Sequence, residues 1–253
     1  MTKLTRDVKF LIRTARAAAK MVTPNFVTTA KDDKGDLITN LDTAIERFIV
    51  ERIKRAYPAF DVLGEEFTPE AKLGPDNFII DPIDGTINFA NGLPIWAVQI
   101  AMARAGETCA SVIYFPVLRE CFYADPSGAY LNGRRIHASG AAFEKSLFAC
   151  NDLFKSNPIA DDLNRTGGVK MFGKAIDPKI LFRNKREFYC ASAYYSWVAC
   201  GRMGTVAFGS PIYDHAAGQY ICKMAGAYTY HNKETKLGVA TTDKRVMSVL
   251  ESK

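Results

Sequence analysis

The chain has 253 residues, of which 48% are hydrophobic and 24% are charged, and these proportions are ordinary for a globular protein with a large core. A net charge of +6, spread along the sequence, permits an anionic ligand without indicating a dedicated nucleic-acid-binding protein. No apolar run approaches the roughly 18 residues of a membrane-spanning helix, and six scattered cysteines without a Cys-x-x-Cys pair are typical of reduced thiols in a cytoplasmic protein.

The first 60 residues predict two amphipathic helices. Apolar side chains recur at helical spacing from Leu4 to Val22 and again from Leu41 to Ala56, with a proline shortly after each run. Either Thr39 or Asn40 is suited to cap the second helix.

From Phe60 onward the hydrophobic pattern changes to that of short strands separated by turns. Most of these runs are joined by only a few residues, which favours hairpins and a mostly antiparallel sheet. The predicted strands are Phe60–Leu63, Asn77–Ile80, Ala97–Ala103, Thr108–Phe115, Glu120–Ala124 and Ala129–Leu131.

In the second half, predicted strands and helices alternate, which is typical of an α/β layer. Small and polar residues cluster near Ala138–Glu144, so we expect an N-terminal α+β half over residues 1–140 and a C-terminal α/β half over residues 141–253. The predicted strands are Leu147–Cys150, Val169–Phe172 and Thr205–Phe208, and the predicted helices are Ser192–Arg202, Asp214–Ala225 and Asp243–Lys253.

Residues 77–90 carry the strongest chemical signal. An apolar run delivers Asp81 and Asp84 into a turn whose backbone is fixed by a proline and Gly85, and Thr86 follows where a helix can begin. Carboxylates at the end of a buried strand, beside backbone N–H groups, can hold hard cations and a phosphate together. This arrangement predicts metal-assisted phosphate chemistry.

Three further acids stand where strands end or helices begin, and each has a structural alternative. Asp42 and Asp214 fall in the first turn of predicted helices, where an acid often acts as a cap or a dipole partner. Glu65 follows a glycine after a predicted strand, a position typical of a solvated loop. Taken alone, none of these acids distinguishes the two interpretations.

Four motifs make the chain resemble the inositol monophosphatase family of magnesium-dependent, lithium-sensitive phosphatases. Gly35–Asp42, Leu63–Glu66 and Asp81–Phe89 match three family signatures in order, and Tyr213–Gly218 matches a fourth, with tyrosine where the family has tryptophan. The resemblance implies a layered α-β-α-β-α sandwich of the inositol monophosphatase and fructose-1,6-bisphosphatase type. It also implies a homodimer that acts on a small phosphorylated substrate.

The resemblance assigns metal ligands residue by residue. Glu65, Asp81 and the backbone carbonyl of Ile83 would hold a first Mg²⁺, and Asp81, Asp84 and Asp214 a second. Glu65 would share a third, looser ion, so two or three ions are expected in the site. Oxygen ligands of this kind are those that Mg²⁺ prefers.

The resemblance also assigns the groups that handle phosphate and water. The N–H groups of Gly85 and Thr86 would bind the phosphate, while the Thr86 hydroxyl, bonded to Asp42, would orient and help deprotonate the attacking water. Lys31 sits where the family carries a lysine near the metal acids, although a solvated loop is an equal alternative.

Departures from the family pattern concern the substrate. Inositol-binding members carry a glutamate at the position of Ala207, and their next substrate segment falls at Tyr189–Ala191, which makes Ala191 a candidate substrate contact. His215 is a second candidate that could reach the leaving group, or it could be a packing residue. Phosphatase chemistry is therefore expected with a substrate that need not be an inositol phosphate.

Several alternatives stay open. An aspartyl-nucleophile phosphatase of the haloacid dehalogenase class also uses strand-end aspartates, but with a closer spacing than Asp81 and Asp84. A fructose-1,6-bisphosphatase, histidinol-phosphatase or nucleotide 3′-phosphatase specialist is possible within the family. A dual-role regulatory protein that binds RNA or transcription factors is a different class, but no run of interleaved aromatic and basic residues supports a nucleic-acid partner.

Overall fold

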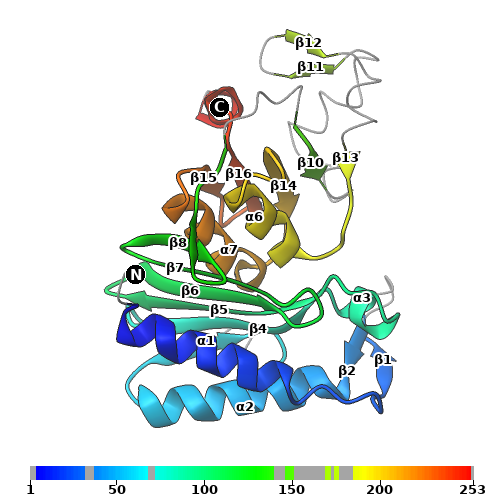
Figure 1. The fold of residues 1–253 in the computed structure, drawn as a ribbon, viewed down its shortest axis with the longest axis vertical. Helices are drawn as coiled ribbons and strands as arrows, with labels where there is room; N and C mark the ends of the chain where they lie inside the picture. The colour runs from blue at the N-terminus through cyan, green and yellow to red at the C-terminus, as the bar shows by residue number, and fades with distance from the viewer. Residues whose placement is uncertain are drawn as a thin grey trace.

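The computed structural model describes residues 4–31, 37–67, 72–139, 146–150, 169–171, 174–176 and 185–251. Two helices, α1 (Arg6–Ala19) and α2 (Asn40–Ala56), form the outer layer at one end of the molecule (Figure 1). Thr39 caps α2, and the Asp42 carboxylate accepts a hydrogen bond from the Thr39 N–H in a capping box. Both predicted helices are thus confirmed, with a short hairpin of β1 (Thr28–Ala30) and β2 (Leu37–Thr39) between them.

A seven-stranded sheet lies against α1 and α2. Its strands follow each other in chain order, and every neighbouring pair is antiparallel except the first, β3 with β4. The prediction of a mostly antiparallel sheet is confirmed. The strands are β3 (Asp61–Gly64), β4 (Asn77–Asp84), β5 (Ala97–Arg104), β6 (Glu107–Phe115), β7 (Glu120–Asp125), β8 (Gly128–Leu131) and β9 (Arg134–Ile136).

The opposite face of this sheet is covered by α6 (Ala191–Ala199) and α7 (Ile212–Met224), and a second sheet lies beyond them (Figure 1). The second sheet is mixed, and α8 (Lys244–Glu251) contacts its last two strands. These layers form the expected α-β-α-β-α sandwich. In spatial order the second sheet contains β13 (Lys185–Arg186), β10 (Phe148–Cys150), β14 (Thr205–Gly209), β16 (Leu237–Thr241) and β15 (Tyr228–His231).

The second half differs from its prediction in several elements. The strands β15 and β16 were not predicted, and the strand expected at Val169–Phe172 pairs instead in a separate hairpin of β11 (Val169–Met171) with β12 (Lys174–Ile176). Part of the boundary region near Ala138–Glu144 and the first two residues of the Gly35–Asp42 motif lie outside the described residues, so the division at residue 140 stays a prediction.

Two hydrophobic cores hold the layers together. One fills the space between α1, α2 and the seven-stranded sheet, and the other lies between that sheet, α6, α7 and the second sheet. Burial of this apolar surface is the main favourable contribution to folding. Among the described residues, no helix is both long and apolar enough to cross a membrane.

The strand β4 extends beyond its predicted end at Ile80 and carries both aspartates of the motif. Asp81 pairs with Gln99, but Asp84 pairs with Ala97, so the register shifts between the two acids. In a regular strand, residues three apart point to opposite faces. The irregularity inserts an extra residue around Pro82, and this brings both carboxylates to the same side of the sheet.

Candidate active site

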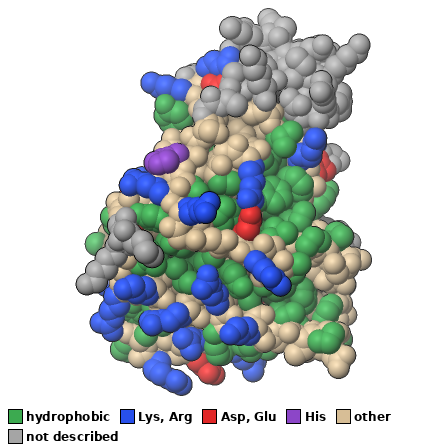
Figure 2. Space-filling model, viewed as in Figure 1, with side chains coloured by type: hydrophobic (Ala, Val, Ile, Leu, Met, Phe, Trp, Pro, Cys, Tyr) green, Lys and Arg blue, Asp and Glu red, His purple; other side chains and the backbone are tan. Residues whose placement is uncertain are grey.

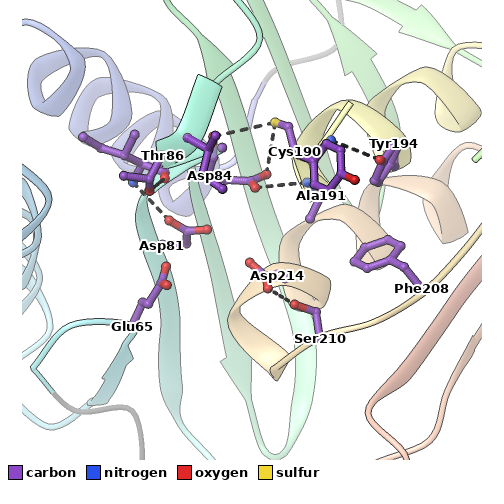
Figure 3. Close-up of a pocket in the computed structure, with 14 residues that line it drawn as sticks. Glu65, Asp81, Asp84, Thr86, Cys190, Ala191, Tyr194, Phe208, Ser210 and Asp214 are labelled. Carbon is purple, nitrogen blue, oxygen red and sulfur yellow. Dashed lines mark hydrogen bonds between the residues drawn. The ribbon is translucent and has the colours of Figure 1, made fainter. Parts of the chain in front are cut away.

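Three aspartates converge at the edge where β4 meets α7. Asp81 and Asp84 come from β4, Asp214 comes from the first turn of α7, and one carboxylate oxygen of each lies within 4.8 Å of the others (Figure 3). They line a pocket of about 260 Å³, together with Glu65, Ile83 and other residues.

Parallel pairing of β3 and β4 explains how Glu65 reaches this site. Gly64 ends β3 opposite Ile80, so Glu65 follows the end of β3 next to Asp81, the residue after Ile80 in β4. Glu65 lines the same pocket as the aspartates. Residues from two distant motifs are therefore brought together by the strand register.

Asp81 and Asp84 are oriented by hydrogen bonds from different elements. Asp81 accepts from the Ile83 N–H at 3.0 Å and from the Gln99 side chain at 3.2 Å. Asp84 accepts from the Ala191 N–H at 3.0 Å and from the Ser192 N–H, so it caps α6, which has no cap of its own. A helix N-terminus favours the ionised form of such a carboxylate.

Asp214 is held through the loop that precedes α7. The Ser210 hydroxyl donates a hydrogen bond to the Asp214 carboxylate (Figure 3). The carbonyl of Ser210 in turn lies 2.9 Å from His215 Nε2, and His215 Nδ1 lies 2.7 Å from the Tyr195 hydroxyl. Because Nε2 faces only carbonyl oxygens, it carries the proton, and Nδ1 accepts from Tyr195.

Burial raises the pKa values of all four acids, and repulsion from neighbouring acids adds to this effect at Glu65, Asp81 and Asp214. Burial, followed by the charges of neighbouring acids, raises the pKa values of Asp81 and Asp214 well above the ordinary range. Burial also raises the pKa of Asp84, and it raises that of Glu65 to about 7 against the opposing charge of Lys31. Buried carboxylates of this density need a compensating cation. Their oxygens, with the Ile83 carbonyl, fit a hard divalent ion such as Mg²⁺.

Lys31 and Glu46 fix the loop that carries Glu65. Lys31 Nζ lies 2.7 Å from Glu65 Oε1 and 2.9 Å from Glu66 Oε1. Glu46 of α2 is fully buried and accepts from the N–H groups of Glu66 at 2.8 Å and Phe67 at 3.0 Å. Glu46 could not be predicted as a functional residue, because an acid within an amphipathic helix is usually solvated and its spacing from the loop gives no sign of the contact.

Thr86 and Asp42 meet although they lie 44 positions apart in sequence. The Thr86 hydroxyl is 3.2 Å from Asp42 Oδ1 and 2.9 Å from the Ile83 carbonyl. Asp42 is 1% exposed, and burial raises its pKa. Asp42 also closes the capping box of α2 with Thr39. It therefore serves both as a helix-capping residue and as the hydrogen-bond partner of Thr86. Asp42 contacts Thr86 behind the pocket rather than lining it among the described residues.

Gly85 precedes α3 (Thr86–Ala90) and adopts the left-handed backbone conformation, with φ of 88°. A Cβ added at this position would lie 2.9 Å from the Ile95 carbonyl oxygen and 3.3 Å from Cys190 Cβ. A side chain here would therefore be strained by the backbone and crowded by two neighbours. Only glycine lets the chain pass close to the N-terminus of α6 at this turn.

We expect Gly85→Ala to lower the free energy of unfolding by about 1–3 kcal/mol, because it adds close contacts to an unfavourable backbone conformation. Urea unfolding of the two proteins measures the difference. Gly92→Ala is the matched control, since Gly92 also has a positive φ of 72° but has no neighbour within 4 Å of the added Cβ. Equal losses in the two variants would show that crowding at Gly85 contributes nothing.

The two candidate substrate residues, Ala191 and His215, lie in different environments. Ala191 lines the pocket, and its N–H is bonded to Asp84. His215 is fully buried, lies outside the described pocket lining, and packs between Tyr195 and Phe208. Burial, followed by the charge of His231, lowers its pKa to about 4, so it is neutral near pH 7. The expectation that His215 reaches the leaving group is therefore replaced by the packing alternative.

A sequence model of the inositol monophosphatase family matches residues 3–250. The chain belongs to the inositol monophosphatase family. Nus factor SuhB of Escherichia coli is 32% identical over 85% of this chain and 81% of its own length. Fructose-1,6-bisphosphatase/inositol-1-monophosphatase of Thermotoga maritima is 35% identical over 76% of this chain and 70% of its own length. A solved Thermotoga maritima IMPase structure aligns with a TM-score of 0.74 and 26% identity, covering 97% of each chain.

Family membership accords with the sandwich architecture and with an acidic group able to bind a divalent metal. The family signatures at Leu63–Glu66, Asp81–Phe89 and Tyr213–Gly218 all deliver residues to one pocket. The relatives carry names of different kinds, a Nus factor and phosphatases, so membership by itself supports a hydrolase only at the level of class.

Proposed function

We propose that the protein is a Mg²⁺-dependent phosphatase of the inositol monophosphatase type that hydrolyses a small phosphate monoester. The observation that carries this proposal is the convergence of Asp81, Asp84 and Asp214 beside Glu65 in one pocket. Two buried acids, Asp81 and Asp84, and two partly buried acids, Glu65 and Asp214, all with raised pKa values, destabilise the site unless a cation compensates them, and such an arrangement is typical of a functional site. The relatives that are named as phosphatases add to this support.

The proposed roles follow from where each group lies. Glu65, Asp81, Asp84, Asp214 and the Ile83 carbonyl would hold two or three Mg²⁺ ions. When bound, these ions supply Lewis-acid stabilisation of the phosphoryl, attacking and leaving oxygens. The N–H groups of the turn at Gly85 and Thr86 would bind phosphate oxygens, because successive N–H groups in such a turn form an anion-binding concavity.

Thr86 and Asp42 are proposed to prepare the attacking water. The Thr86 hydroxyl would orient the water molecule, and Asp42 would accept the proton that passes through Thr86. The Asp42 carboxylate can do this because its raised pKa makes it a stronger base than an ordinary aspartate. No covalent phosphoenzyme is required, which distinguishes the proposal from the haloacid dehalogenase alternative.

We expect release of inorganic phosphate from a panel of small phosphate monoesters only when Mg²⁺ is present, with inhibition by lithium. Because Ala207 stands where inositol-binding members carry an acid, we expect no strong preference for inositol 1-phosphate over sugar phosphates or glycerol 2-phosphate. Phosphate release with Mg²⁺ and with excess chelator measures the metal dependence, and comparison of the rates across the panel measures the substrate preference. Full activity in chelator would overturn the metal role, and a thousandfold preference for inositol 1-phosphate would overturn the specificity.

A regulatory role is the second candidate. It is favoured by the similarity to the Escherichia coli relative named as a Nus factor, which is 32% identical. Figure 2 shows Lys and Arg side chains spread over the visible face, among hydrophobic and neutral ones. Such a distribution allows contact with a polyanion on this face. The homodimer implied by the resemblance stays a prediction that light scattering can check.

A further inference from the structure

A strained tyrosine stands at the mouth of the pocket. Tyr189 lines the pocket, is 57% exposed, and adopts a left-handed backbone conformation with φ of 47°. This conformation is uncommon for a residue with a bulky side chain and has an energetic cost. A large exposed ring held at such a cost beside an active-site pocket indicates a role in ligand contact rather than in packing.

Tyr194 holds Tyr189 in this conformation. The Tyr194 hydroxyl accepts hydrogen bonds from the N–H groups of Phe188 at 2.8 Å and Tyr189 at 3.1 Å. Tyr194 itself is 2% exposed, so its position is fixed by the core around it. The Tyr189 hydroxyl is 3.4 Å from the carboxylate of Glu187, and this contact engages the tip of the side chain while the ring remains exposed.

The described residues that line the pocket near Tyr189 offer few free hydrogen-bonding groups to a substrate. Ala191, Tyr194 and Phe208 lie on the opposite side of the pocket from Glu65 and Asp81 (Figure 3). The polar groups of this wall are already engaged: the Cys190 thiol and the Ala191 N–H bond to Asp84, and the Ser210 hydroxyl bonds to Asp214. Among the described residues, this side of the pocket is therefore mainly apolar and aromatic, and the pocket lining also includes Ile87, 39% exposed.

We propose that the substrate is a phosphate monoester whose alcohol portion presents a flat apolar or aromatic face, and that the Tyr189 ring packs against this face. The inference rests on the proposed phosphatase function and adds the class of leaving group. A polyol would have to give up hydrogen bonds to water without finding replacements on this wall. An aromatic or apolar face gains contact area and ring stacking.

The test compares 2-phenylethyl phosphate with glycerol 1-phosphate. Both are primary alkyl esters, so the phosphoryl chemistry is alike and a difference in rate reports contacts with the leaving group. We expect kcat/KM to be about 10-fold or more higher for 2-phenylethyl phosphate. Tyr189→Asn should remove about that factor for 2-phenylethyl phosphate, mainly through KM, because the lost contact is made equally in ground and transition states. The change in kcat/KM for glycerol 1-phosphate should be much smaller, so the preference between the two esters is lost.

Asparagine is chosen because it tolerates the left-handed conformation, so the ring is lost without added backbone strain. Tyr189→Phe keeps the ring and should retain the preference. Tyr228→Asn is the matched control, since Tyr228 is 43% exposed but does not line the described pocket. Calorimetric binding of 2-phenylethylphosphonate should show the same order among the variants without turnover.

Four results would overturn the inference. Equal kcat/KM for the two esters, or a preference that Tyr189→Asn leaves intact, would remove the proposed contact while the phosphatase function stands. A change of oligomeric state in Tyr189→Asn, seen by light scattering, would assign the ring to a contact between copies of the chain. Failure of the wild-type protein to hydrolyse either ester with Mg²⁺ would overturn the proposed function together with the inference.

Discussion

Asp81→Asn is expected to lower Mg²⁺-dependent phosphate release by about 10³-fold or more while leaving the metal-free protein at least as stable as the wild type. Asp81 lies between Glu65 on one side and Asp84 and Asp214 on the other, and as a proposed ligand of two cations it cannot be replaced by a neutral amide without weakening both sites. A loss of several kcal/mol in transition-state stabilisation corresponds to a factor of this size.

The stability half of this prediction follows from the direction of the pKa shift. Burial and the charges of Glu65, Asp84 and Asp214 raise the pKa of Asp81 in the folded state above its value in the unfolded chain. The folded state then binds protons more tightly, so the metal-free protein loses stability as pH rises from near the unfolded pKa through the folded one. At pH 7 this cost is present in the wild type and absent in Asp81→Asn.

Thermal unfolding with chelator and with Mg²⁺ measures both effects. The wild type should gain stability when Mg²⁺ is added, because an ion that binds only the folded state stabilises it, and Asp81→Asn should gain much less. Asp125→Asn is the matched control, since Asp125 is a 1% exposed acid of the same sheet that accepts from Ser127 and lies outside the described pocket. Normal turnover in Asp81→Asn, or an unchanged response to Mg²⁺, would contradict the assignment.

The part of the site whose residues lie close together in sequence could be predicted. Asp81, Asp84, Gly85 and Thr86 lie within six residues, so a strand, a turn and a following helix suffice to place them. Glu65 is assigned to the site only through the family resemblance, because the parallel pairing of β4 with the strand that Glu65 follows could not be predicted from the sequence. The register shift between Asp81 and Asp84 could not be predicted either, because a bulge depends on the partner strand.

The supporting residues could not be predicted because their roles depend on distant contacts. Glu46 reaches the loop after β3, Gln99 reaches Asp81 from the neighbouring strand, and Ser210 reaches Asp214 across the start of α7. Glutamate, glutamine and serine are usually solvated, and none of them indicates a function by its type alone. Their function appears only when the fold brings a carboxylate or an N–H group to them.

The strands β15 and β16 of the second sheet were not predicted, whereas β10 and β14 were. Leu237–Thr241 is entirely buried as β16, but it is short and contains a glycine, which weakens the sequence signal of a strand. The structure supplies the reason for Gly238: a Cβ there would lie 2.3 Å from His215 Nδ1 and 2.4 Å from the Tyr195 hydroxyl. A glycine required by close packing against α6 and α7 cannot be distinguished from a turn glycine in a single sequence.

Thr86→Ala is expected to lower kcat by about 10²–10⁴-fold while Mg²⁺ and substrate affinity stay within a few-fold, since general-base assistance to water is typically worth that factor. Its hydroxyl lies 3.2 Å from Asp42 Oδ1 and 2.9 Å from the Ile83 carbonyl, so the single proton is shared between a base and a carbonyl oxygen. Thr86→Ser keeps the hydroxyl and should retain most of the activity.

Asp42→Asn should lower kcat to a similar extent, and the double variant should lose much less than the product of the two single losses, because the residues act as one unit. Asp42 also closes the capping box of α2, a contribution of about 1 kcal/mol to stability that unfolding measurements can separate from catalysis. Thr43→Ala is the control within the same helical turn, since its exposed hydroxyl bonds only to the Asn40 carbonyl among the described contacts. Multiplicative losses in the double variant would show that Thr86 and Asp42 act independently, and would break the proposed path of the proton.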